Sequence, residues 1–155
     1  MGANMARRLK EVGYSVTAVL DVNTQAAADL ATELGCKACT KLADVTAAAD
    51  VIFTVVTNDA AMRAIYFNAA DNLLAGAQGK IFINCATLSP AIFREVYDAA
   101  KKAGADSLEA CMASSISHAR EGKLYLMLAG DEPVYDRVKA MIEQMSVNRR
   151  FIGAA

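Results

Sequence analysis

The first residues of the chain, Met1-Gly2-Ala3-Asn4-Met5-Ala6, join small side chains to the start of a helix predicted over 2–12. A helix that opens in this way usually follows a strand and a glycine loop that hold a phosphate, because its free backbone N–H groups and the positive end of its dipole attract anions. Met1 and Gly2 are therefore candidate phosphate-binding residues. The alternative is a helix start that binds no specific anion.

Polar residues also follow two predicted strands. Asp21-Val22-Asn23 comes directly after the strand predicted at Ser15–Leu20, and Val56-Thr57-Asn58 closes the strand predicted at Asp50–Val56. Ligands of open α/β sheets bind at the carboxyl ends of strands, and an acid at the end of the second strand accepts hydrogen bonds from ribose hydroxyls. We expect this role for Asp21, and the alternative is a solvated or helix-capping acid.

Hydroxyl side chains form a third candidate group. Thr87 follows one predicted strand, and Ser114 and Ser115 follow the next. The two serines suit a substrate carboxylate, but all three hydroxyls would also serve as turn or helix-cap residues. His118 is the only histidine, and we do not assign it as a general base because Glu121 is the only carboxylate in its segment that could orient it.

These candidates belong to an almost unbroken alternation of helix and strand patterns. Helices are predicted at 2–12, 24–34, 42–48, 59–67, 90–103, 116–121 and 132–145, and strands at 15–20, 37–40, 50–56, 80–84, 106–111, 124–128 and 147–152. Such alternation predicts an α/β fold with a doubly wound, mostly parallel sheet and helices on both faces. The length of 155 residues predicts a single domain, 1–155.

Composition excludes several classes of function. The net charge of −1 and the absence of a basic stripe argue against nucleic acid as a partner. No apolar run reaches the ~18 residues of a membrane span, and no signal peptide is visible. Cys36 and Cys39 have Cys-x-x-Cys spacing but lack two further ligands, so no metal site is predicted, and the four cysteines indicate a reducing, cytoplasmic location.

The motifs together resemble the nucleotide-binding domain of the β-hydroxyacid dehydrogenases, which include 3-hydroxyisobutyrate, tartronate-semialdehyde and phosphogluconate dehydrogenases. Met1–Leu9 is similar to the second half of the family's opening Gly-x-Gly-x-Met-Gly-x-x-Met-Ala-x-Asn-Leu. The other segments that carry the resemblance are Asp21–Asn23, Val55–Asp59 (Met-Leu-Pro-x-Asp), Asn84–Pro90 (Asp-x-Ser-Thr-x-x-Pro), Glu109–Ser115 (Asp-Ala-Pro-Val-Ser-Gly-Gly) and Gly122–Asp131 (Gly-Thr-Leu…Gly-Gly-Asp).

The resemblance implies a Rossmann-like domain that binds NAD or NADP, with NAD slightly favoured because Val22 brings no cation for a 2′-phosphate. It places Gly2 at the fingerprint's third glycine, the residues 56–58 beside the cofactor ribose, and Thr87 toward the nicotinamide. It also places Ser114 and Ser115 in the substrate loop, where Ala113 stands in place of the family's serine. Complete relatives oxidise a 3-hydroxy acid by hydride transfer, with a lysine as acid and base.

Several parts of the family pattern are not found in these residues, namely the first strand with its two glycines, the helix of the catalytic lysine and the all-helical domain. We therefore expect no catalysis by this chain alone, and a late gene start is one explanation. In the strand order 3-2-1-4-5-6 the first strand is central, so we expect rearrangement or a partner chain to close the gap. A homodimer formed by strand exchange is the preferred form. The alternative function is a non-catalytic binding or assembly module.

Overall fold

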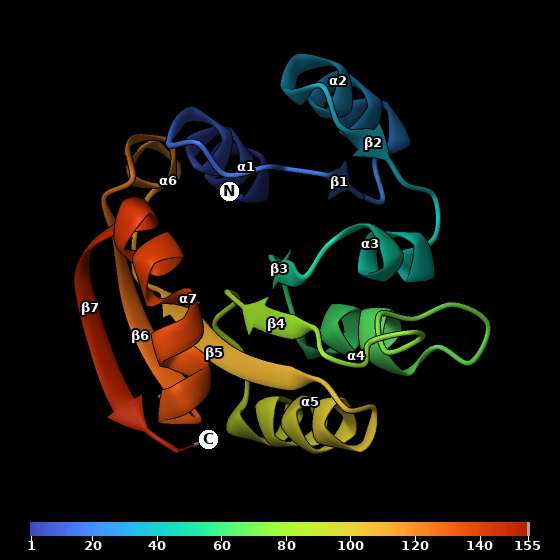
Figure 1. Cartoon of the computed structure of the whole chain (residues 1–155), viewed down its shortest axis with the longest axis vertical. Helices are drawn as coiled ribbons and strands as arrows, with labels where there is room; N and C mark the ends of the chain where they lie inside the picture. Colours follow the sequence, from blue (N-terminus) through green and yellow to red (C-terminus); the bar gives the residue numbers. More distant parts are fainter. Residues whose placement is uncertain (155) are drawn as a thin grey trace.

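Helices and strands alternate along residues 1–154, the part of the chain that the computed structural model describes; Ala155, the last residue of the predicted domain 1–155, lies outside it. The helices are α1 (Gly2–Glu11), α2 (Thr24–Leu34), α3 (Leu42–Ala48), α4 (Asp59–Phe67), α5 (Pro90–Lys102), α6 (Ile116–Glu121) and α7 (Glu132–Met145). The strands are β1 (Ala18–Val19), β2 (Lys37–Ala38), β3 (Val51–Thr54), β4 (Ile81–Asn84), β5 (Asp106–Met112), β6 (Leu124–Gly130) and β7 (Ser146–Gly153) (Figure 1).

Local capping signals set the helix ends where the sequence predicts them. The side chain of Asn23 accepts a hydrogen bond from the N–H of Ala26 at the start of α2, and Gly35 ends that helix in the left-handed conformation. At the start of α5, the Ser89 side chain accepts from the N–H of Ile92 and Pro90 occupies the first turn. The predicted helices are thus confirmed to within a residue.

The sheet is mostly parallel, as predicted, but it is divided. Strands β3, β4, β5, β6 and β7 form one sheet in that order, in which only the β5–β6 pair is antiparallel, and β1 pairs with β2 in a separate parallel sheet. Within residues 1–154 the chain therefore does not rearrange to close the gap between β1 and β3, and closure by a partner chain stays a prediction. β1 and β3 are shorter than the predicted 15–20 and 50–56, because only Ala18 and Val19 pair with β2 and only Val51–Thr54 pair with β4.

Helices cover both faces of the larger sheet, as a doubly wound fold requires (Figure 1). On one face α1, α6 and α7 bury residues such as Met5, Ala119 and Ile142 against the sheet. On the other face α4 and α5 bury Met62 and Phe93 among others. All four residues of β4 are buried, so this strand lies at the centre of the core and holds the loops at its ends in fixed positions.

Candidate cofactor-binding site

The start of α1 lies against the end of β3. A Cβ atom placed on Gly2 would be 3.4 Å from Cβ of Val55, the residue directly after β3. The helix begins without a side-chain cap, as α3 and α7 also do, whereas α2, α4, α5 and α6 each have one. The first turn of α1 therefore offers its N–H groups at the carboxyl end of β3 without a competing side-chain acceptor.

The loops after β3 and β4 are joined by Asp59. Its carboxylate accepts hydrogen bonds from the Ser89 N–H (3.1 Å) and from the Ser89 hydroxyl. These two bonds lower the pKa of Asp59. Of the neighbouring predicted residues, Asn58 caps α4 by accepting from the Ala61 N–H at 2.8 Å, and Thr57 is exposed.

Asp21, Val22 and Asn23 form an exposed turn after β1. Oδ1 of Asp21 accepts from the N–H of Asn23 at 2.9 Å, and Asn23 in turn caps α2. The Val22 side chain is fully exposed. No hydrogen bond within residues 1–154 joins this turn to the other predicted site residues, since it lies on the far side of the gap between β1 and β3 (Figure 1).

The predicted hydroxyl group sits at the same edge of the sheet, and its members have local partners. Thr87 is exposed and donates a long hydrogen bond of 3.4 Å to the carbonyl of Met112, at the end of β5. Ser114 accepts from the Tyr125 N–H at 2.8 Å. Ser115 caps α6 in a reciprocal arrangement with His118, in which Nδ1 of His118 accepts from the Ser115 N–H. The helix-cap role, the alternative recognised in the sequence, is therefore real for Ser115, whereas Ser114 bonds to β6.

Asn4, which the sequence does not single out, links α1 to the predicted substrate loop. Its Nδ2 donates to the carbonyl of Ile116 at 3.1 Å. The start of α1 lies close to Val55, and the loops after β3, β4 and β5 are linked by hydrogen bonds between Asp59 and Ser89, Thr87 and Met112, and Asn4 and Ile116. The structure brings together every predicted site segment except 21–23.

A buried polar network beneath these loops also could not be predicted from the sequence. Oδ1 of Asn84 accepts from the hydroxyls of Thr54 (2.7 Å) and Tyr66 (2.8 Å), and its Nδ2 donates to Oγ of Ser107 at 3.0 Å. Burial raises the pKa of Tyr66, which keeps this hydroxyl a neutral donor. The network fixes β3, β4 and β5 relative to one another. Its only sequence signal is that polar Asn84 ends a continuous apolar strand.

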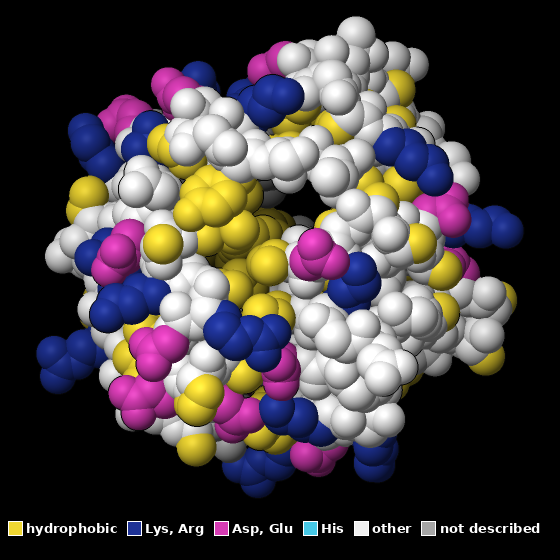
Figure 2. Space-filling model, viewed as in Figure 1, with side chains coloured by type: hydrophobic (Ala, Val, Ile, Leu, Met, Phe, Trp, Pro, Cys, Tyr) yellow, Lys and Arg dark blue, Asp and Glu magenta, His cyan; other side chains and the backbone are white. Residues whose placement is uncertain are grey.

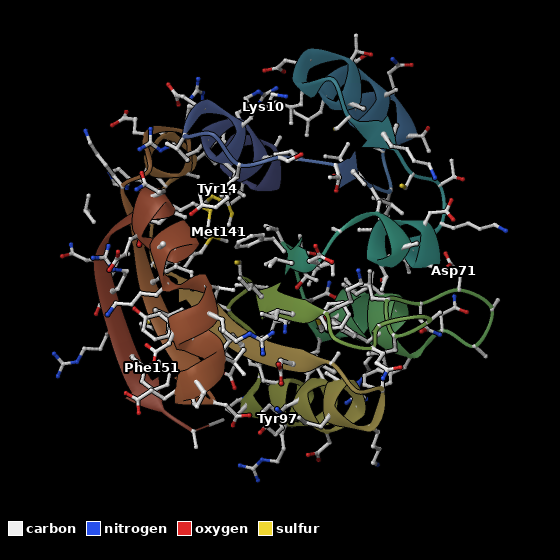
Figure 3. All side chains as sticks on the ribbon, in the orientation of Figure 1. Lys10, Tyr14, Asp71, Tyr97, Met141 and Phe151 are labelled. Carbon is white, nitrogen blue, oxygen red and sulfur yellow. The ribbon has the colours of Figure 1, made fainter. Side chains whose placement is uncertain are left out.

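Charged residues gather at the opposite edge of the sheet, around a broad surface depression. Nζ of Lys101 lies 2.7 Å from Asp106 and 2.8 Å from Asp131, and Arg137 pairs with Asp106 at 2.8 Å. Figure 3 shows Tyr97 at this end of the molecule, and its hydroxyl donates to Asp131. Since carboxylates neutralise both cations, this depression has little attraction for an anionic cofactor.

Residues 1–154 contain neither a candidate metal site nor a helix that could span a membrane. No group of three or more His, Cys, Asp or Glu side chains is placed to hold a metal ion, and the four cysteines are free thiols. None of the helices in this part of the chain combines the length and apolar character needed to traverse a bilayer.

Comparison with known proteins gives a match over nearly the whole chain. The family model of the NAD binding domain of 6-phosphogluconate dehydrogenase matches residues 1–153. The 2-hydroxy-3-oxopropionate reductase of Escherichia coli is 30% identical over 99% of this chain and 51% of its own length. The NAD-dependent L-serine dehydrogenase of Pseudomonas aeruginosa is 30% identical over 96% of this chain and 49% of its own. The chain thus spans about half the length of the curated relatives it matches.

Solved structures agree with this assignment. The 3-hydroxyisobutyrate dehydrogenase of Mycobacterium tuberculosis, determined with L-serine, superposes with a TM-score of 0.89 at 29% identity. The match covers 100% of this chain and 52% of the dehydrogenase chain. An imine reductase from Myxococcus stipitatus in complex with NAD+ shares the fold, with a TM-score of 0.86 at 18% identity over 99% of this chain and 51% of its own. The predicted family is confirmed: this chain belongs to the NAD-binding domains of the 6-phosphogluconate and 3-hydroxyisobutyrate dehydrogenase family.

Proposed function

We propose that this chain binds a nicotinamide dinucleotide at the carboxyl edge of its strands and forms the cofactor half of an oxidoreductase for a small 3-hydroxy acid. The observation that carries the proposal is the uncapped start of α1, which Gly2 brings against Val55 at the edge where the loops after β3, β4 and β5 meet. Membership of the family supports it.

The residues present suit such a cofactor. The first N–H groups of α1 would bind the pyrophosphate. The exposed carboxylate of Asp21 uses Oδ1 in its own turn, and Oδ2 would accept hydrogen bonds from the ribose hydroxyls. Because Val22 is exposed and uncharged, nothing in this turn attracts a 2′-phosphate, so the proposal favours NAD over NADP.

The remaining predicted residues would complete the site around the ribose, the nicotinamide and the substrate. Exposed Thr57 would lie beside the ribose, Thr87 beside the nicotinamide, and Ser114 and Ser115 beside a substrate carboxylate. Ser115 would contribute while it still caps α6, because a hydroxyl oxygen can accept more than one hydrogen bond. The bound nicotinamide supplies the hydride chemistry, and this chain's residues orient it.

We further propose that the chain alone does not catalyse hydride transfer. Two lysines considered for this role are engaged elsewhere: Lys101 is paired with two carboxylates at the opposite edge, and Lys123 lies 2.9 Å from Glu121. A second candidate function, a non-catalytic assembly module, is favoured by the unpaired edges of β1 and β3. The homodimer expected from the sequence stays a prediction.

Calorimetric titration with NAD+ and NADP+ tests the proposal. We expect NAD+ to bind more tightly than NADP+. The Asp21→Asn substitution should reduce the ratio of the two affinities by about tenfold, which corresponds to ~1.4 kcal/mol. The cause is the loss of charge repulsion toward the 2′-phosphate and of hydrogen bonding to the ribose. Asp29→Asn, which changes an exposed acid on α2, is the matched control and should leave both affinities unchanged. Absence of binding of either dinucleotide at millimolar concentration would contradict the proposal and favour the assembly module.

A further inference from the structure

Helix α1 lies between α6 and α2 (Figure 1), and its first turn is hydrogen-bonded to α6 through Asn4. Nδ2 of Asn4 donates to the carbonyl of Ile116, the first residue of α6, at 3.1 Å, and Oδ1 of Asn4 accepts from Nη1 of Arg7 at 3.0 Å. Both ends of the side-chain amide are therefore engaged. The amide can have only this orientation, because exchanging its O and N would set acceptor against acceptor and donor against donor.

Arg7 extends this connection to α2. Its Nε and Nη2 each lie 2.7 Å from one carboxylate oxygen of Glu33, in the last turn of α2. Such a fork fixes the direction of the guanidinium as well as its distance. Within residues 1–154 no other side-chain hydrogen bond joins α2 to a second helix. Glu33, Arg7, Asn4 and Ile116 thus connect α2, α1 and α6, and we call them the Asn4 bridge.

Helix α6 is attached to α1 at both of its ends. At its last turn Nη1 of Arg120 lies 2.7 Å from the carboxylate of Glu11, and the Arg8 side chain passes over Gly122, which leaves no room there for a Cβ. Figure 2 shows basic and acidic side chains next to one another over α1 and α6. At the start of α6, Asn4 makes the one side-chain hydrogen bond to α1 within residues 1–154. Loss of this bond would therefore release the start of α6 while its end stays attached.

The bridge connects two parts of the proposed site. Asn4 belongs to the first turn of α1, whose N–H groups would bind the pyrophosphate. Ile116 directly follows Ser114 and Ser115, the candidate substrate residues, and Ser115 is the cap of α6. Because a cap moves with the first turn of its helix, the position of Ser115 depends on where Asn4 holds the start of α6.

We infer that Asn4 is a positioning residue: it holds Ser114 and Ser115 in place relative to the pyrophosphate, so that a cofactor bound at the first turn of α1 also orders the substrate loop. This inference rests on the proposed function, because the ordering step needs the cofactor. The bound pyrophosphate restricts the first turn of α1. It thereby removes part of the entropy cost of holding the Asn4 side chain, and the bond to Ile116 becomes stronger.

Amide hydrogen exchange by NMR tests the bridge first without cofactor. The probes are the N–H groups of His118 and Ala119, which donate to the hydroxyl and the carbonyl of Ser115, both at 3.3 Å. Asn4→Ala should make both exchange about two- to tenfold faster, the range expected from the loss of one hydrogen bond. The amides of α5 should not change. Asn148→Ala, which alters an exposed amide side chain on β7, is the matched control and should leave all of these rates as they are.

The second measurement repeats the exchange with NAD+ at a concentration that saturates each chain by calorimetry. In the native chain NAD+ should slow the exchange of His118 and Ala119 by about a further fivefold, and in Asn4→Ala it should not. Coupling between two sites is reciprocal, so the affinity of Asn4→Ala for NAD+ should fall by the same factor. A residue that serves only to stabilise the fold would not produce this agreement between the two factors.

Asn4→Asp separates positioning from folding. The carboxylate keeps an acceptor for Arg7 and suits the first turn of a helix, but it sets an oxygen against the carbonyl of Ile116. This variant should be as resistant to urea as the native chain and still show faster exchange of His118 and Ala119 without cofactor.

Three results would overturn the inference while NAD+ still binds. They are native exchange rates in Asn4→Ala and Asn4→Asp without cofactor, equal protection by NAD+ in Asn4→Ala and the native chain, or acceleration in α5 as large as in α6. Failure of the native chain to bind NAD+ in the calorimeter is a separate result, which would overturn the proposed function and the ordering step with it.

Discussion

Gly2 and Val55 are in van der Waals contact range across the junction of α1 and β3: a Cβ on Gly2 would lie 3.4 Å from both Cβ and Cγ2 of Val55. In a dinucleotide-binding fingerprint the third glycine allows the helix to pack closely on the strand. The resemblance to the family predicts this role for Gly2. The contact places the free N–H groups of α1 at the end of β3, so it connects the packing of the fold with the proposed phosphate site.

This contact predicts a size limit at residue 2. A methyl group fits at ordinary van der Waals distance, so Gly2→Ala should leave the free energy of unfolding nearly unchanged. The branched side chain of Gly2→Val would overlap Val55 and should cost about 1–3 kcal/mol. Urea denaturation of the two variants measures the difference, and equal stability of Val and Ala at this position would show that α1 does not pack tightly on β3.

The buried network around Asn84 predicts graded losses of stability. Asn84→Ala leaves the hydroxyls of Thr54 and Tyr66 without their shared acceptor and should cost about 3 kcal/mol. Tyr66→Phe removes one donor while Asn84 keeps Thr54 and Ser107, and should cost about 1 kcal/mol. Chemical denaturation at neutral pH measures both, and an Asn84→Ala variant no less stable than Tyr66→Phe would refute the network's bracing role.

Asp59 predicts a pH dependence of stability. Hydrogen bonds from Ser89 lower the pKa of Asp59 in the folded chain, so the folded state binds fewer protons at this site than the unfolded state. The resulting stabilisation is present above the unfolded-state pKa, about 3.9, and is lost as the pH falls through the lower folded-state value. The gap in urea midpoint between the native chain and Asp59→Asn should therefore be wide at pH 7 and narrow toward pH 3.

A matched variant separates this effect from general acid sensitivity. Asp136→Asn changes an exposed acid on α7, and its midpoint should stay close to that of the native chain across the same pH range. If the difference in urea midpoint between the native chain and Asp59→Asn stays constant with pH, the charge of the carboxylate does not stabilise its hydrogen bonds with Ser89.

Local signals explain why the helices could be predicted from the sequence. Asn23 and Gly35 delimit α2, and Ser115 and Gly122 delimit α6, through hydrogen bonds and backbone conformations within a few residues. Strand ends depend instead on pairing between distant segments. The apolar run 15–20 predicts a longer strand than Ala18–Val19, because the sequence cannot show that β1 and β2 pair at two positions only.

Part of the candidate site could also be predicted from the sequence. The alternation of strands and helices places Thr57, Thr87 and Ser114 at one edge of the sheet, and the structure agrees. The links between loops could not be predicted, because the bonds of Asp59 to Ser89 and of Asn84 to Thr54 require the register of β3 against β4. Whether these residues bind a cofactor stays a prediction.

The central claim is that a nicotinamide dinucleotide binds at the carboxyl edge, and an NMR titration of the labelled chain with NAD+ tests it most directly. The account predicts that the largest amide shift changes fall on the first turn of α1 (Gly2 and Ala3) and on the loops at 21–23, 57–58 and Thr87. Residues around Lys101 and Arg137, at the opposite edge, should not change. Shift changes confined to that opposite edge, or none at millimolar NAD+, would contradict the account.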